Sequence, residues 1–82
     1  MRVLKIETFA YHDGKLIDSV SVPSALAKTF IRFLPKNFAS QFNENSEQLE
    51  AIISAISDPT FNGTILDITD TKDNERVIIS IS

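Results

Sequence analysis

The chain has 82 residues, of which 43% are hydrophobic and 23% charged, a composition typical of one folded domain and not of a disordered segment. The net charge of −3 and the pI near 4.9 argue against nucleic-acid binding, which depends on a clustered basic surface. The chain contains no cysteine, which excludes a disulfide framework, a cysteine-based zinc site and a cysteine nucleophile. We expect a single domain over residues 1–82 that uses no cofactor and does not bind nucleic acid.

The N-terminal stretch alternates in hydrophobicity and predicts a β-hairpin. Residues 2–9 and 16–22 form the two expected strands, and Asp13-Gly14 between them is typical of a two-residue type I′ turn. The adjacent apolar pair Leu16-Ile17 leaves the register of the second strand open by one position. The side chains expected to face inward are those of Leu4, Ile6, Thr8, Val20 and Val22.

The middle of the chain predicts two helices. Residues 25–34 have α-helical spacing, with Leu26, Phe30, Phe33 and Leu34 at i, i+4, i+7 and i+8. The helix begins with Ser24 as N-cap or with Val22 as N-cap and Pro23 at N1, and Pro35 ends it. A short helical turn capped by Asn37 follows over residues 36–43. The second helix ends near Ser57 and buries one face, formed by Leu49, Ile52, Ile53 and Ile56.

A second hairpin closes the chain and completes the fold class. Residues 64–70 and 77–81 are the expected strands, with Leu66, Ile68, Val77, Ile79 and Ile81 facing inward. We therefore predict an α+β fold of order ββααββ, with a four-stranded, mostly antiparallel sheet and the helices on one face. The strand order stays open. The other face would carry an unusual number of apolar side chains, namely Phe9, Ile17, Ile65 and Ile78.

Two groups of residues have side chains suited to chemistry, and neither forms a complete site pattern. His12 is the single histidine, and its neighbour Asp13 is the only obvious orienting group, so we interpret it as a solvated turn residue. The acidic cluster of Asp67, Asp70, Asp73 and Glu75 departs from a calcium-binding loop, which needs ligands at alternate positions and a central glycine. We therefore predict a protein that is not an enzyme and has no catalytic, cofactor-binding or metal residues.

The apolar surplus of the central helix indicates an interaction surface. A two-layer domain has limited room for so many large side chains, so part of them would form an exposed patch, although a small core could also absorb most of them. Lys28, Arg32 and Lys36 follow at i, i+4 and i+8 and would form a basic stripe beside it. The candidate interaction surface is Lys28, Phe30, Ile31, Arg32, Phe33, Lys36, Phe38 and Phe42.

Several short motifs resemble a SHOCT-like module of uncharacterised bacterial proteins. The run VPSALAK at residues 22–28, followed by FLPK at residues 33–36, is similar to its P-x-x-L-A-K … L-P-K signature. The DGK turn at residues 13–15 and the stretches GTILDI and ERVIISI resemble its flanking hairpins. The resemblance implies no catalytic residue, cofactor or established activity.

Two functions therefore remain as hypotheses. The first is a non-catalytic interaction or assembly module, with a protein partner or a second copy of the chain as its target. The alternative, which we favour less, is a peripheral membrane or envelope-associated regulator that contacts lipid through the basic stripe and the neighbouring phenylalanines. No basic segment followed by an apolar one opens the chain, so we expect the cytoplasm as its location.

Overall fold

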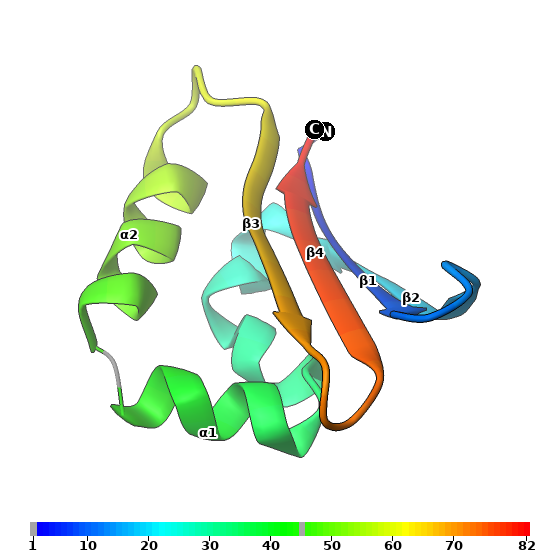
Figure 1. The fold of residues 1–82 in the computed structure, drawn as a ribbon. Coiled ribbons are helices and arrows are strands. Elements are labelled where there is room, and N and C mark those ends of the chain that lie inside the picture. The colour runs from blue at the N-terminus through cyan, green and yellow to red at the C-terminus, as the bar shows by residue number, and fades with distance from the viewer. Residues whose placement is uncertain (1, 45) are drawn as a thin grey trace.

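The chain forms an α+β domain in which a four-stranded sheet is covered by helices, as the computed structural model shows in Figure 1. The structure describes residues 2–44 and 46–82, and the side chains of residues 42–46 lie outside this description. The observed order confirms the predicted ββααββ fold class. Its elements are β1 (Val3–Ala10), β2 (Leu16–Pro23), the 3₁₀-helix η1 (Ser24–Phe33), α1 (Lys36–Glu44), α2 (Ser46–Ser57), β3 (Gly63–Asp70) and β4 (Glu75–Ile81).

The strand order is β2-β1-β4-β3, and every neighbouring pair is antiparallel. The first and last strands therefore pair at the centre of the sheet, which places the two ends of the chain side by side (Figure 1). Val3 and Ser82 each donate a backbone hydrogen bond to the other, at 2.8 Å and 3.2 Å. The hairpin strands β2 and β3 are left as the two edges.

One face of the sheet forms the core. The inward residues predicted for the two central strands are all buried, namely Leu4, Ile6, Thr8, Val77, Ile79 and Ile81. They meet Phe30 of η1, Phe38 of α1 and Ile52 of α2, which are also buried. The edge strands contribute less, because only Val22 of β2 is buried and Leu66 and Ile68 of β3 are partly buried.

The central helix differs from the predicted α-helix. η1 is a 3₁₀-helix, in which three residues complete a turn, so residues three apart lie above one another. Ala27 and Phe30, three residues apart, accordingly form its buried face, and Leu26 beside them is 57% exposed. Phe33 ends the helix and is 43% exposed, although it lies three residues after Phe30. Neither predicted N-cap forms, because β2 continues to Pro23, which precedes the helix without a side-chain cap.

The end of η1 follows the prediction from Pro35. Leu34 is extended, with φ −89° and ψ 150°, because the ring of the following proline disfavours the helical region. The residue is still buried, since the turn out of the helix directs its side chain into the core. The Pro35 carbonyl then accepts hydrogen bonds from the N–H groups of Phe38 and Ala39, which starts α1.

The first hairpin turn is longer than the predicted two-residue turn. A type I′ turn needs positive φ at both central residues, but among the described non-glycine residues only Asn74 has positive φ. Gly14 alone has the left-handed conformation in this loop, with φ 70°. Its N–H donates to the Ala10 carbonyl, and the Ala10 N–H donates to the Lys15 carbonyl, so the loop spans residues 11–15.

Two irregularities correct the predicted outer face of the sheet. The β1–β2 register shifts between Thr8 and Phe9, and Ile17 then shares a hollow on the helix side with Thr8. The β3–β4 register shifts between Thr64 and Leu66, and Ile65 packs against the core. Because each shift adds a residue to one strand, it reverses the faces that simple alternation predicts. Of the four expected apolar residues, Phe9 and Ile78 do line a hollow on the outer face.

Candidate functional site

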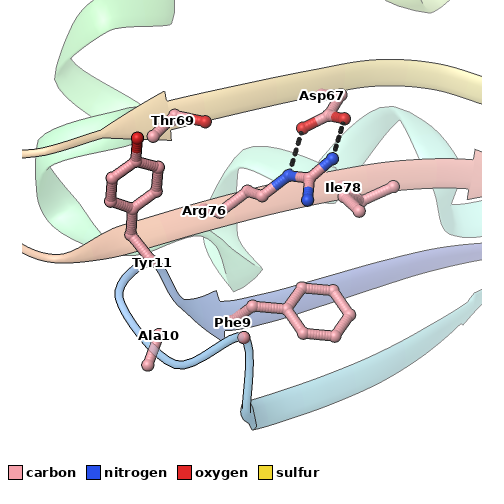
Figure 2. A pocket seen from close by; sticks show the side chains of 8 residues that line it. Phe9, Ala10, Tyr11, Asp67, Thr69, Arg76 and Ile78 are labelled. Carbon is pink, nitrogen blue, oxygen red and sulfur yellow. Dashed lines mark hydrogen bonds and ion pairs between the residues drawn. The ribbon is translucent and has the colours of Figure 1, made fainter.

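The outer face of the sheet carries a shallow hollow of about 420 Å³. It lies where β1 runs into its loop and crosses β4 and β3, as Figure 2 shows. Its lining combines aromatic, apolar and charged groups: Phe9, Ala10, Tyr11, Gly14, Asp67, Thr69, Arg76 and Ile78. Tyr11 reaches from the loop toward Thr69 in this view.

An ion pair between neighbouring strands occupies the floor of this hollow. The Arg76 Nε donates to Asp67 Oδ1 at 2.8 Å, and the Arg76 Nη2 donates to Asp67 Oδ2 at 2.5 Å. The hydrogen bonds from the guanidinium hold the pKa of the Asp67 carboxyl below its ordinary value. Both side chains are about half exposed, so solvent screens the pair and it contributes little to stability. Because each charge already has its partner, the hollow offers neither a free cation nor a free base.

A second hollow, of about 310 Å³, opens on the helix side of the sheet. It lies between the start of β2 and the end of η1, and its exposed rim includes Ile17 and Phe33. Arg32 and Asp18 add one charge of each sign to the rim. Its complete lining is Thr8, Ile17, Asp18, Arg32, Phe33, Leu34, Pro35 and Glu75.

The structure divides the predicted interaction surface into buried and exposed residues. Phe30 and Phe38 have no exposed surface, so they belong to the core and are not accessible to a partner. Ile31 is partly buried and packs against the core. Phe33 is exposed, and Phe42 lies outside the described side chains. The small core has therefore absorbed two of the phenylalanines that the sequence suggested as surplus.

The basic residues of the predicted surface are exposed but do not form the expected stripe. Lys28, Arg32 and Lys36 would share one face of a continuous α-helix. On η1, four residues correspond to one turn and a further third of a turn, which places Lys28 and Arg32 about 120° apart. Lys36 belongs to a different helix, α1.

Exposed apolar residues outside the predicted interaction surface lie on β2 and η1. Leu16 and Ile17 are 53% and 59% exposed, and Leu26 on η1 is similarly exposed. The ambiguous Leu16-Ile17 pair was the available signal, because two adjacent apolar residues in a strand cannot both face the core. Leu26 could not have been found, since its exposure follows from the 3₁₀ geometry.

Two members of the acidic cluster, Asp67 and Asp70, are engaged in local structural contacts. Asp70 accepts hydrogen bonds from the backbone N–H groups of Lys72 and Asp73 and from Asn37 Nδ2, the last at 2.8 Å. These bonds, with that of Asn37 the largest contribution, lower the pKa of the Asp70 carboxyl. Asn37 lies inside α1 and tethers it to the β3–β4 turn, so it is not the predicted cap. No cluster of metal-ligating side chains is found within the described residues.

His12 lies in the exposed loop after β1. Its backbone N–H donates to Asn74 Oδ1 at 2.8 Å, and its ring lies 5.7 Å from the ring of Tyr11 in a tilted arrangement. These contacts join the β1–β2 loop to the β3–β4 turn. The contacts of His12 therefore have a structural role, and neither of them brings a nucleophile to its ring.

In the described part of the chain, no helix is long and apolar enough to cross a membrane. No curated protein and no solved structure matches the chain. One family model does match, over residues 2–80, and its description is YvlB-like protein, C-terminal domain. The predicted resemblance to a SHOCT-like module is therefore wrong: the shared motifs were short and consist of turn, proline and strand residues that many small domains use. The match covers nearly the whole chain, and the chain belongs to the family of YvlB-like C-terminal domains.

Proposed function

We propose that this domain is a non-catalytic protein–protein interaction module, acting in the cytoplasm, whose contact surface lies on β2 and η1. The β2–η1 surface consists of Ile17, Leu26 and Phe33, whereas Leu16 pairs with Phe9 and lies on the outer side of the sheet. Among the described residues, these are three of the five large apolar side chains that are exposed. Their concentration on two neighbouring elements is the observation that carries the proposal, since exposed apolar clusters mark interaction sites.

The position of η1 brings these residues together. η1 contacts both β1 and β2, starts directly after Pro23 and ends at the hollow that contains Ile17. It therefore runs back along the edge strand. Ten residues of 3₁₀-helix span about 20 Å, and eight strand residues span about 26 Å, so the helix follows most of β2. An α-helix of the same length would reach only about 15 Å.

A non-catalytic role is consistent with two engaged carboxylates, because Asp67 is paired with Arg76 and Asp70 accepts a hydrogen bond from Asn37.

The direct test is the oligomeric state of the purified chain across micromolar concentrations. We expect size-exclusion chromatography with light scattering to show a mass that rises with concentration. The double variant Ile17→Ser/Phe33→Ser should remain monomeric, because it removes two exposed apolar side chains of the β2–η1 surface. Tyr11→Ser is the matched control, since Tyr11 is 45% exposed but lines the outer hollow. A wild-type chain that stays strictly monomeric, or a control that dissociates equally, would contradict the proposal.

A second candidate is contact with a membrane surface. It is favoured by η1, which exposes Lys28 and Arg32 together with Leu26 and Phe33. Basic and apolar side chains exposed on one helix suit binding to anionic lipid. Two cations contribute only about 1 kcal/mol each, which makes this the weaker candidate. Co-sedimentation with anionic vesicles tests it, and an absence of bound protein would remove it.

A further inference from the structure

The edge strand β2 exposes a row of backbone groups that a second strand could use. The Ser24 N–H donates to the Arg2 carbonyl at 3.2 Å, which identifies Arg2 and Ser24 as a hydrogen-bonded pair. Such pairs alternate along an antiparallel ladder, so Val22 and Val20 also direct their backbone groups toward β1. Ser19 and Ser21 therefore direct theirs away from the sheet.

An independent contact agrees with this assignment. The Ser19 N–H is accepted by the carboxylate of its neighbour Asp18 at 2.9 Å, which an N–H engaged with β1 would not allow. On the other side of β1, where it pairs with β4, Val3 and Ser82 form a hydrogen-bonded pair. Odd-numbered residues of β1 therefore bond to β4, and even-numbered ones to β2, as the alternation requires.

The two edges of the sheet are protected to different degrees. The β3 edge carries Asp67 and Asp70 and has a register shift near its start, features that discourage further strand pairing. β2 has a single charged residue, Asp18, among its eight residues. Pro23 removes one N–H at its end, and the register shift lies at its beginning. The segment between them is the more available edge.

We propose that β2 pairs with β2 of a second copy in an antiparallel, two-fold arrangement centred on Val20, which joins the two sheets into one of eight strands. This inference rests on the proposed function and specifies its partner. The sequence Ser19-Val20-Ser21 is symmetric about Val20, so each Ser19 faces Ser21 of the other copy. The two residues exchange both of their outward N–H···O=C bonds, and the two Val20 side chains meet on the core side.

The same axis explains the location of the exposed apolar residues. In this register Ile17 lies opposite Pro23 of the second copy, where the ladder ends because proline has no N–H to donate. The start of β2 thereby approaches the start of the other η1, which carries Leu26. Since η1 follows β2 along its length, the two β2–η1 surfaces would come together. Val20, half-buried at the margin of the core, would also gain cover.

Asp18 sets the strength of this association. Its carboxylate accepts the hydrogen bond of the Ser19 N–H, which the second strand needs as a donor. Pairing would also place the Asp18 charge opposite Val22 of the other copy. Asp18→Ala should therefore tighten self-association relative to the wild type. A dimer that is weakened by Asp18→Ala would contradict this role of Asp18 and the pairing with it.

Paired charge substitutions test the register. In Ser19→Lys/Ser21→Glu, lysine faces glutamate across the two-fold axis, whereas in Ser19→Lys/Ser21→Lys lysine faces lysine. Ser19 and Ser21 are both exposed. In the first variant the new lysine at position 19 lies beside Glu7 of β1, and the new glutamate at position 21 lies beside Lys5. We expect the dissociation constant from sedimentation to fall about tenfold in the first variant and to rise by a similar factor in the second. Equal weakening in both variants would overturn the axis at Val20.

A proline substitution tests the backbone contact itself. Ser21→Pro removes an N–H that faces solvent in the monomer, so we expect a folded monomer, with Ser21→Ala as the matched control that keeps the N–H. Circular dichroism verifies the fold, and the charge variants decide the question if the proline variant fails to fold. Self-association that none of these β2 variants alters would overturn the inference and leave the proposed function standing. A wild-type chain that does not associate would overturn both.

Discussion

Asn74 connects the two hairpin loops and has the positive φ of 55° that the β3–β4 turn requires. Its side-chain oxygen accepts the backbone N–H of His12 at 2.8 Å, and its carbonyl accepts the N–H of Tyr11 at 3.1 Å. Asparagine suits this position because its short polar side chain lowers the cost of the left-handed conformation. One residue therefore sets a turn and fastens it to a neighbouring loop.

Substitutions at Asn74 separate these two contributions. Asn74→Gly keeps the favourable backbone and loses the side-chain bond to His12, so we expect a loss of about 1 kcal/mol in the free energy of unfolding. Asn74→Ala also places a β-carbon in the left-handed region and should lose about 2 kcal/mol in total. Urea denaturation measures both values. If the glycine variant were the less stable of the two, the turn strain would not be the deciding factor.

At the scale of elements, η1 shows how helix type selects the buried residues. An α-helix over the same segment would place Leu26 beside Phe30 on one face, four residues apart. The 3₁₀-helix instead aligns Ala27 with Phe30 and leaves Leu26 in solvent. The packing against β1 and β2 therefore depends on a three-residue repeat.

Alanine substitutions distinguish the two helix types. Phe30→Ala should lower the free energy of unfolding by about 3–5 kcal/mol, because Phe30 is completely buried and its removal leaves a cavity. Leu26→Ala should change it by less than about 0.5 kcal/mol, because Leu26 is mostly solvated. Thermal and urea unfolding of both variants provide the measurement. Comparable losses in the two variants would support an α-helical packing and contradict the 3₁₀ geometry.

At the scale of the whole molecule, three carboxyl groups make stability depend on acidity. The pKa values of Asp58, Asp67 and Asp70 are lowered from 3.8, chiefly by hydrogen bonds from Thr60, Arg76 and Asn37 respectively. A lowered pKa means that the folded chain binds fewer protons than the unfolded chain in this range. The stabilisation is therefore fully present above pH 3.8 and is lost as the pH falls through the lower folded values.

The double variant Asp67→Asn/Asp70→Asn tests this dependence. We expect the urea midpoint of the wild type to fall between neutral pH and pH values below 3.8, and that of the variant to fall less, because two of the responsible carboxyls are absent. Asp13→Asn is a suitable control, since its carboxylate accepts only the local Lys15 N–H in the exposed loop. Parallel decreases in wild type and double variant would show that other groups control the acid response.

The sequence by itself determined the order of the elements, the inward residues of the two central strands and the end of η1 at Pro35. These depend on local rules: alternation in a strand, helical spacing, and the steric effect of proline on the residue before it. The short motifs that suggested a SHOCT-like module were equally local. The family match over residues 2–80 replaces that assignment with the YvlB-like C-terminal domains.

Only the tertiary structure decided the strand order, the helix type of η1 and the accessible part of the predicted surface. Packing against the sheet selects a three-residue repeat where the sequence spacing also fits an α-helix, which buries Ala27 and leaves Leu26 exposed. The tertiary structure also buries Phe30 and Phe38 and leaves Phe33 exposed at the end of η1. The register shifts depend likewise on pairing with another strand, so alternation along one strand could not locate Ile17 and Ile65. The β2 edge is a candidate interface because β1 and β4 pair at the centre of the sheet, which leaves β2 as an edge strand.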